Sequence, residues 1–539
     1  MSAGCVLRLG ARRISQKAAA SSTSSWTRFG VRGCHSASSS SSENSVDITK
    51  VPLTEPLPGM PAVTYAKPSP QDDDTRVTTL SNGIRVASQN RFGHFCTVGV
   101  VIDSGPRYEV AFPSGLTHFL EKLAFGATSR HKSRDDVLQI LEKQGGICDC
   151  QSSRDTMIYA ASADTRGLDA VVDLLAEVTL RPQITDDELD AARQAIECEL
   201  RDIDMRPDQE TLLMEMIHKA SYSNNTLGLP KLCPIENVGT IDRHMLFTFL
   251  KQRYTPQQMV VSGVGVDHDS LVEAVSKHFA EKKAIWEQDP SLVGDASLET
   301  DTSISQYTGG VLKVSKDLSD MSLGPTPIPN LAHFVLALES SSHRDPEFIT
   351  YCVINMLMGG GGSFSAGGPG KGMYSRLYTN VLNRYHWMYN ATAYNHAYND
   401  SGIFCIHASA DPAALGDLVD IIANEFAILV ARIGEEELGR AKKQLQSMLL
   451  MNLEQRPVLF EDIGRQVLAT GKRRNAAFYI DAIDAIGEED IHRAAQRMLR
   501  TRASIAALGD LKHLPAVDEI ENGLANPTVR RGKKFSLFR

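Results

Sequence analysis

Long apolar runs and closely paired cysteines are both absent from this sequence of 539 residues. No stretch approaches the ~18–20 consecutive apolar residues of a membrane-spanning helix, so the sequence predicts a soluble protein. The nine cysteines are scattered, and none has the C-x-x-C spacing of a zinc or redox motif. Cys148 and Cys150, the closest pair, are separated by one residue, which is poor geometry for a disulfide. We therefore expect free thiols in a reducing compartment.

Acidic residues are absent from the first 42 residues, which are instead rich in serine and arginine. Together with a weak apolar stripe, this composition is typical of a mitochondrial transit peptide, with cleavage expected near residue 33. A disordered basic tail is the alternative. Loss of this segment would remove six positive charges and change the net charge from −9 to −15. Such an acidic mature chain argues against a nucleic-acid partner and favours a cationic one. The six basic residues are Arg8, Arg12, Arg13, Lys17, Arg28 and Arg32.

The order of predicted elements repeats once along the chain. The tetrapeptide Ala-Ser-Ala-Asp ends a predicted strand at 161–164 and again at 408–411, each time just before a helix with apolar periodicity. Segments 188–200 and 437–449 also align, and the two offsets, 247 and 249, differ by only two residues. A nearly constant offset indicates duplication. The sequence therefore predicts an α+β fold with two homologous halves, each a mainly antiparallel sheet packed with helices.

Changes in composition set the predicted domain boundaries. The transit peptide at 1–42 is followed by a proline-rich lead-in at 43–74. A first peptidase-like domain is expected at 75–283 and a second at 306–539, and a polar, acidic linker at 284–305 joins them.

Local patterns predict the elements within each half. In the first half they indicate a hairpin at Asn82-Gly83, strands at 97–105, 157–164 and 258–266, and helices from about 115 and at 168–180, 186–203, 244–254 and 270–279. In the second half they indicate a strand at 332–340 and helices at 349–358 and 373–383.

Residues 115–125, GLTHFLEKLAF, differ at one position from the inverted zinc-peptidase motif H-x-x-E-H. In that motif two neutral imidazoles bind zinc and the glutamate polarises a metal-bound water. His118 and Glu121 match, but Lys122 replaces the second histidine. An ammonium group has no lone pair for a metal and brings a positive charge to the position of the dication. A helix unrelated to any metal site is the alternative.

The spacing to one further acid is similar to that of the pitrilysin-type (inverzincin) metallopeptidases. Their third zinc ligand is a glutamate that follows the motif after 76 residues, and this spacing from Lys122 leads to Glu199. The resemblance implies a degenerate site made of His118, Glu121, Lys122 and Glu199, in which the ammonium replaces the metal within a salt-bridged cluster. We therefore predict no catalytic residue, no metal ligand and no cofactor in this chain.

Residues 359–372, GGGGSFSAGGPGKG, contain eight glycines. A P-loop would need glycine at Ser365 and a hydroxyl residue at Gly372, so a phosphate-binding interpretation fails. A flexible linker would explain the glycines but not Phe364 or Lys371. Backbone without side chains can approach an extended peptide closely, which favours a substrate-contacting loop. The candidate binding residues are Gly359, Gly360, Gly361, Gly362, Ser363, Phe364, Ser365, Gly367, Gly368, Gly370, Lys371 and Gly372.

Four features together resemble the α-subunit family of the mitochondrial processing peptidases: the degenerate motif, the duplicated halves, the glycine-rich segment followed by MYSRLY, and LEQRPVLFEDIGRQVL at 453–468. The resemblance runs from about residue 75 to the C-terminus. It implies a non-catalytic, substrate-recognition subunit that pairs with a homologous β subunit carrying the zinc site. The pair would remove cationic presequences in the mitochondrial matrix, and peripheral association with the inner membrane is left open.

Two other functions remain as alternatives. A self-sufficient zinc metallopeptidase is disfavoured by Lys122, and a structural core subunit of a respiratory cytochrome complex is disfavoured by the glycine-rich loop. Acidic clusters at 186–190 and 434–438 could attract a basic peptide, although such clusters are commonly solvated helix starts.

Overall fold

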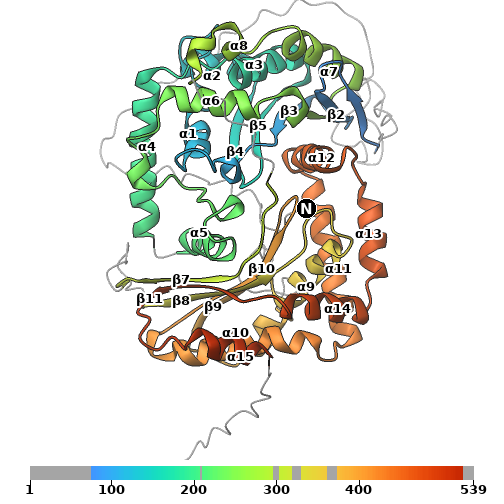
Figure 1. Cartoon of the computed structure of the whole chain (residues 1–539). Helices are drawn as coiled ribbons and strands as arrows, with labels where there is room; N and C mark the ends of the chain where they lie inside the picture. Colours follow the sequence, from blue (N-terminus) through green and yellow to red (C-terminus); the bar gives the residue numbers. More distant parts are fainter. Residues whose placement is uncertain (1–73, 207–208, 295–302, 319–328, 361–372, 526–539) are drawn as a thin grey trace, which may run out of the picture. The chain divides into compact units, whose positions relative to one another are not determined.

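The first half of the chain, drawn in blue to green in Figure 1, is built on a six-stranded sheet. Its strand order is β1-β2-β6-β3-β5-β4. The structure is a computed structural model that describes residues 74–206, 209–294, 303–318, 329–360 and 373–525. The β2–β6 pair is parallel, and the other described pairs of this sheet are antiparallel. The strands are β1 (Arg76–Thr79), β2 (Arg85–Gln89), β3 (Phe95–Ile102), β4 (Ile147–Ser152), β5 (Met157–Asp164) and β6 (Met259–Val264).

The second half is built on a five-stranded sheet with strand order β7-β11-β8-β10-β9. The β7–β11 pair is parallel and the others are antiparallel. This arrangement repeats β2-β6-β3-β5-β4 of the first half strand for strand, so the predicted α+β fold with two homologous halves is confirmed. The strands are β7 (Gly310–Ser315), β8 (Ala332–Glu339), β9 (Met388–Ala397), β10 (Gly402–Ala410) and β11 (Ser504–Gly509).

Helices pack on both sheets. Those of the first half are α1 (Leu116–Leu123), α2 (Arg134–Lys143), α3 (Leu168–Leu180), α4 (Asp186–Met205), α5 (Glu210–Ser221), α6 (Arg243–Arg253), α7 (His268–Val275) and α8 (Ile285–Gln288). Those of the second half are α9 (Phe348–Met358), α10 (Leu415–Ala427), α11 (Glu435–Leu453), α12 (Arg456–Thr470), α13 (Ala476–Ala485), α14 (Glu488–Leu499) and α15 (Val517–Ala525). Within the described ranges, no helix is long and apolar enough to cross a bilayer.

Several local predictions are confirmed and others need correction. The hairpin at Asn82-Gly83 joins β1 to β2, with Gly83 at a positive φ of 99°. The patterns gave no indication of α2 or α5. The helix expected at 373–383 is a π-helical turn at Leu377–Leu382. Part of the acidic stretch expected as a linker forms α8, whose Trp286 is buried in the core of the first half.

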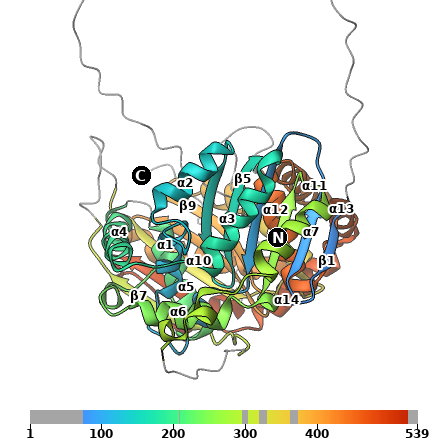
Figure 2. The ribbon, with the colours of Figure 1, turned by 90° about the horizontal axis from the view of Figure 1, so that it is seen from above.

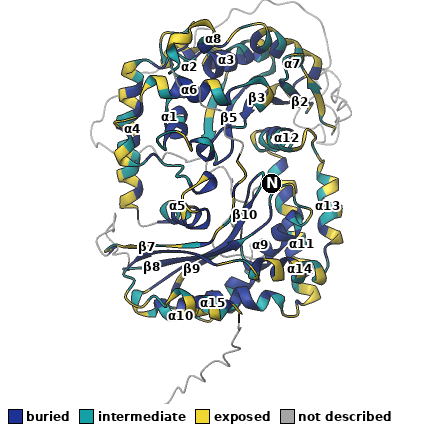
Figure 3. Ribbon diagram, in the orientation of Figure 1, coloured by how far each residue is buried: buried dark blue, intermediate teal, exposed yellow. Residues whose placement is uncertain are grey.

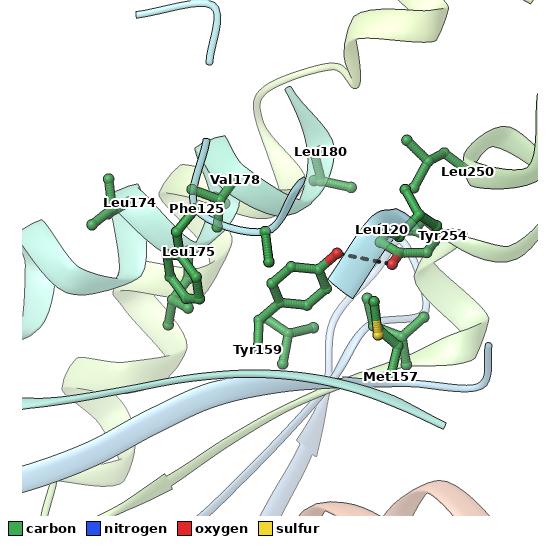
Figure 4. Close-up of a cluster of buried hydrophobic side chains, with 14 of the residues drawn as sticks. Leu120, Phe125, Met157, Tyr159, Leu174, Leu175, Val178, Leu180, Leu250 and Tyr254 are labelled. Carbon is green, nitrogen blue, oxygen red and sulfur yellow. Dashed lines mark hydrogen bonds between the residues drawn. The ribbon is translucent and has the colours of Figure 1, made fainter. Parts of the chain in front are cut away.

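Alternating side chains of each central strand enter two different cores. On β3, Val98, Val100 and Ile102 point to the helices of the first half, while Val101 points to the opposite face. Helices α2 and α3 lie on the first of these faces and are prominent in the view from above (Figure 2). In the same core the hydroxyls of Tyr159 and Tyr254 are joined by a 3.0 Å hydrogen bond among buried leucines and valines (Figure 4). The strands β8 and β10 are almost wholly buried, because both of their faces are covered (Figure 3).

Two helices pack on the sheet of the other half. Helix α12 belongs to the second half but covers the Val101 face of the first sheet, with Phe460 and Ile463 buried there. Helix α5 belongs to the first half but packs Leu213 and other residues on the second sheet. The close approach of α12 depends on glycine, because a Cβ at Gly464 would lie 2.4 Å from a methyl of Val101. The halves are thus held together by an exchange of helices.

Candidate functional site

Helix α1 carries the degenerate motif, and a buried acid fixes its first turn. The carboxylate of Glu109 accepts 2.6 Å hydrogen bonds from the backbone N–H groups of Gly115 and Thr117. It thereby satisfies donors that a helix start leaves unpaired. Burial raises the pKa of Glu109 to about 7, against the effect of these hydrogen bonds. The motif helix therefore starts at a defined position.

Three of the four predicted motif residues come together between α1 and α4. One oxygen of the Glu199 carboxylate lies 2.5 Å from the Lys122 Nζ and 3.2 Å from the His118 Nε2. His118 is 4% exposed, whereas Lys122 and Glu199 are about one-quarter and one-third exposed. Glu199, which was predicted from its spacing, is therefore a neighbour of the motif helix.

The hydrogen bonds of His118 determine which of its nitrogens carries the proton. The backbone N–H of Cys233 donates to Nδ1 at 3.1 Å, so Nδ1 carries no proton. The proton of the neutral ring then lies on Nε2 and points at Glu199. A zinc ligand must present a lone pair, and here both ring nitrogens are already engaged. His118 is set as a hydrogen-bond donor rather than a metal ligand.

Packing holds Cys233 in this position. Gly115, at the start of α1, has a φ of 120°, and a Cβ there would lie 2.4 Å from the Cys233 sulfur. Only glycine allows the segment around Cys233 to approach α1 so closely. No pattern in the sequence indicated the hydrogen bond from Cys233 to His118, because it joins residues 115 positions apart.

The fourth motif residue, Glu121, has a different partner. Its carboxylate accepts hydrogen bonds from the backbone N–H of Ser152, at 3.1 Å, and from the Ser152 hydroxyl. Ser152 ends strand β4, so Glu121 ties α1 to the sheet rather than sharing the ammonium of Lys122 with Glu199. The prediction that Glu121 pairs with Lys122 is therefore wrong, because Ser152 engages this carboxylate instead.

The electrostatics of the cluster favour an ionised Glu199. The hydrogen bond from His118 is the largest cause, and with the Lys122 ammonium it outweighs partial burial and lowers the pKa of Glu199 to about 2. The carboxylate is thus charge-balanced by lysine at the place where a zinc ligand would face the metal. Among the described residues, no group of three or more His, Cys, Asp or Glu side chains is arranged to hold a metal ion.

The glycine-rich segment begins at the second sheet. Gly359 ends α9 in the left-handed conformation with a φ of 119°, and Gly360 forms a parallel β-bridge with Ala393 of β9. A Cβ at Gly360 would lie 2.0 Å from the side-chain oxygen of Asn355, so this entry requires glycine. The other predicted binding residues lie outside the described residues: Gly361, Gly362, Ser363, Phe364, Ser365, Gly367, Gly368, Gly370, Lys371 and Gly372.

Comparison with known families agrees with this duplicated architecture. Residues 85–235 match the model of the insulinase-type peptidases of family M16, and residues 240–445 match that of the M16 peptidase inactive domain. The chain belongs to peptidase family M16. The degenerate motif with His118 and Lys122 lies in the part of the chain that the peptidase model matches.

Relatives of this M16 chain share most of its length. It is 53% identical over 490 residues to the mitochondrial-processing peptidase subunit alpha of Bos taurus, covering 91% of this chain and 92% of the relative. The subunit of the same name in Homo sapiens is 52% identical over 491 residues, with the same coverage. That of Caenorhabditis elegans is 41% identical over 504 residues, covering 93% of this chain and 98% of the relative. The predicted resemblance to this family is therefore confirmed.

Proposed function

We propose that this chain is the substrate-recognition α subunit of a mitochondrial processing peptidase. It would bind cationic presequences and present them to a homologous β subunit, which supplies the catalytic zinc. The proposal includes the domain division at 75–283 and 306–539 and the removal of a transit peptide at 1–42, near residue 33. The expected location is the mitochondrial matrix, with peripheral contact to the inner membrane left open. The relatives do not favour the two alternative functions.

One observation carries the non-catalytic part of this proposal. Lys122 occupies the position of a zinc ligand and pairs with Glu199, while His118 presents a proton to the same carboxylate. A working site of this kind needs three protein ligands and an open position for water. Here Lys122 and His118 offer no lone pair to a metal, and the carboxylate of Glu199 is neutralised by the Lys122 ammonium.

Reconstitution tests this assignment. The mature chain, its β partner and the mixture should each be assayed with a basic presequence peptide, and each should be analysed for zinc. Cleavage is expected only in the mixture, with zinc only in the β subunit. Stoichiometric zinc and peptide cleavage by the isolated chain would refute the proposal.

Charge supports the choice of substrate. A mature chain of net charge −15 attracts a cationic peptide over long range, and salt screens this attraction within about 8–10 Å at physiological ionic strength. The affinity for a basic presequence peptide should therefore fall steeply as salt is raised. Affinity that does not depend on salt would contradict the electrostatic part of the proposal.

The glycine-rich segment can be tested without disturbing the sheet. A deletion of 361–368 keeps Gly359 and Gly360, and so keeps the end of α9 and the bridge to β9. We expect weaker binding of basic peptides and an unchanged melting temperature. A matched deletion in the 319–328 segment serves as the control for shortening the chain, and equal peptide affinity in both deletions would count against a substrate-contacting loop.

A further inference from the structure

A basic pocket of about 690 Å³ opens in the first half, at the C-terminal end of α3. Four of its lining side chains are cationic and one is a carboxylate, in a chain whose net charge is −9. None of them belongs to the His118 cluster or to the glycine-rich segment. The pocket is lined chiefly by Ser129, Arg130, Glu177, Arg181, Lys282 and Lys283.

A buried ion pair forms the rigid wall of this pocket. Glu177 is 1% exposed and accepts hydrogen bonds from the Arg181 Nε, at 2.8 Å, and from the Ser129 hydroxyl, at 2.9 Å. The Arg181 guanidinium is 4% exposed, and its other nitrogens reach the backbone carbonyls of His278 and Lys283. The one carboxylate of the lining is thus satisfied by its own neighbours.

The cations at the mouth of the pocket are only partly neutralised. Arg130 and Lys282 both pair with Asp173, at 2.5 and 2.8 Å, and the His278 Nδ1 lies 2.8 Å from the same carboxylate. Arg130 also lies 3.9 Å from the buried Glu177. Burial alone would raise the pKa of Asp173, but the hydrogen bonds from these two cations lower it, so the acid is ionised. Lys283 is exposed, and its ammonium has no partner within the described part of the chain. Four cations against two carboxylates leave an excess of two positive charges.

We propose that this pocket binds a phosphate group. Arginine forks and lysine ammonium groups are the side chains that bind phosphate oxygens, through charge-assisted hydrogen bonds. Arg130 and Lys282 lie at the mouth of the pocket and are only partly neutralised by Asp173, and the buried Arg181 lies behind them. A dianion bound there would neutralise the local excess of positive charge. The phosphate group could belong to a soluble phosphate ester or to a phospholipid headgroup, because both present the same chemistry.

Two variants separate this pocket from general surface charge. The double variant Arg130→Gln/Lys283→Gln removes the exposed cations but keeps Arg181, since its loss would leave the buried Glu177 unpaired. Lys313→Gln, an exposed lysine on β7 in the other half, is the matched control. Equal melting temperatures of the three proteins would show that the fold is intact.

Calorimetric titration of the mature chain with inorganic pyrophosphate gives the first measurement. Wild-type and Lys313→Gln should bind it, and the double variant should bind about ten-fold or more weakly, as expected for the loss of charge-assisted hydrogen bonds. Absence of binding by the wild type, or equal binding by all three proteins, would exclude a site for a soluble phosphate ester and leave only the lipid headgroup to be tested.

Flotation with vesicles of phosphatidylcholine alone, or with added cardiolipin, distinguishes the two sources. Cardiolipin-dependent binding that the double variant loses and the control keeps assigns the pocket to a lipid headgroup. Pyrophosphate binding without vesicle binding assigns it to a soluble phosphate ester. If neither arm shows a difference between the double variant and the control, the pocket is not a phosphate site.

Discussion

Replacing Lys122 with histidine restores the sequence H-x-x-E-H of the zinc motif. The structure predicts that this variant binds zinc only weakly. The new imidazole would remove the ammonium that now pairs with Glu199 and would offer a second nitrogen. The His118 Nε2 would still carry a proton instead of a free lone pair, because Nδ1 accepts the hydrogen bond from the Cys233 N–H.

The size of this effect follows from that one hydrogen bond. For His118 to bind zinc through Nε2, its proton must move to Nδ1, where it would face the donor N–H of Cys233. Losing a buried hydrogen bond and leaving a donor unpaired costs about 1–3 kcal/mol. We therefore expect Lys122→His to bind zinc roughly 5- to 150-fold more weakly than a three-ligand site whose histidines are already set.

Equilibrium dialysis against zinc, followed by metal analysis, measures this directly. Lys122→Gln is the matched control, because it removes the same charge without offering a metal-binding nitrogen, and it should bind no zinc. A proton fixed on the His118 Nε2 would be refuted if Lys122→His bound zinc as tightly as the β subunit does. It would be refuted more simply if the unmodified chain already held one zinc.

Three further predictions concern the fold and its electrostatics. Gly464→Ala should lower the free energy of unfolding by about 1–3 kcal/mol, because the added methyl group would collide with Val101 of β3. Gly439→Ala, on α11 with nothing near the added methyl group, should raise it by about 0.5–1 kcal/mol. Chemical denaturation measures both changes, and a change in the same direction for both variants would contradict the close approach of α12 to β3. Glu199→Gln should cost about 1–2 kcal/mol at neutral pH, after allowance for an exposed third of the side chain. Because the folded pKa of about 2 lies below the ordinary value of 4.5, this difference from wild type should shrink as the pH falls from about 4.5 toward 2, and a difference independent of pH in thermal melts would exclude the mechanism. Arg107→Met should lower the free energy of unfolding by about 3–5 kcal/mol, because it leaves the carboxylate of Asp400, in the other half, without its ion-pair partner. The double variant Arg107→Met/Asp400→Leu should recover a large part of this stability, and no recovery would contradict the role of the ion pair.

The duplicated architecture was predictable because the predicted elements occur in the same order in both halves, at a nearly constant offset along the sequence. Strands with alternating apolar residues, and helices with regular apolar periodicity such as α3 and α4, carry their signal within one segment. Helix α5 was missed because it has no side-chain cap and its apolar residues match a surface of the other half. Helix α2 had a usable signal, since the Ser133 hydroxyl caps its first turn at Asp136.

The site was predictable in its members but not in its hydrogen bonds. A fixed spacing led from Lys122 to Glu199, and their ion pair follows from charge alone. The proton position on His118 depends on a backbone N–H far along the chain, and Glu121 bonds to the end of a strand rather than to the lysine. Backbone donors look alike in every sequence, so contacts of this kind come only from three-dimensional structure.

The exchange of α5 and α12 bears on how the two repeats can exist. Each sheet takes part of its apolar covering from the other repeat, so a repeat expressed by itself would expose Val101 and its neighbours, or their counterparts on β8, to water. Such a fragment should aggregate, while a chain severed between the repeats should stay associated as a complex of two pieces. The two repeats are therefore expected to depend on each other for folding, because each sheet is covered in part by a helix of the other repeat.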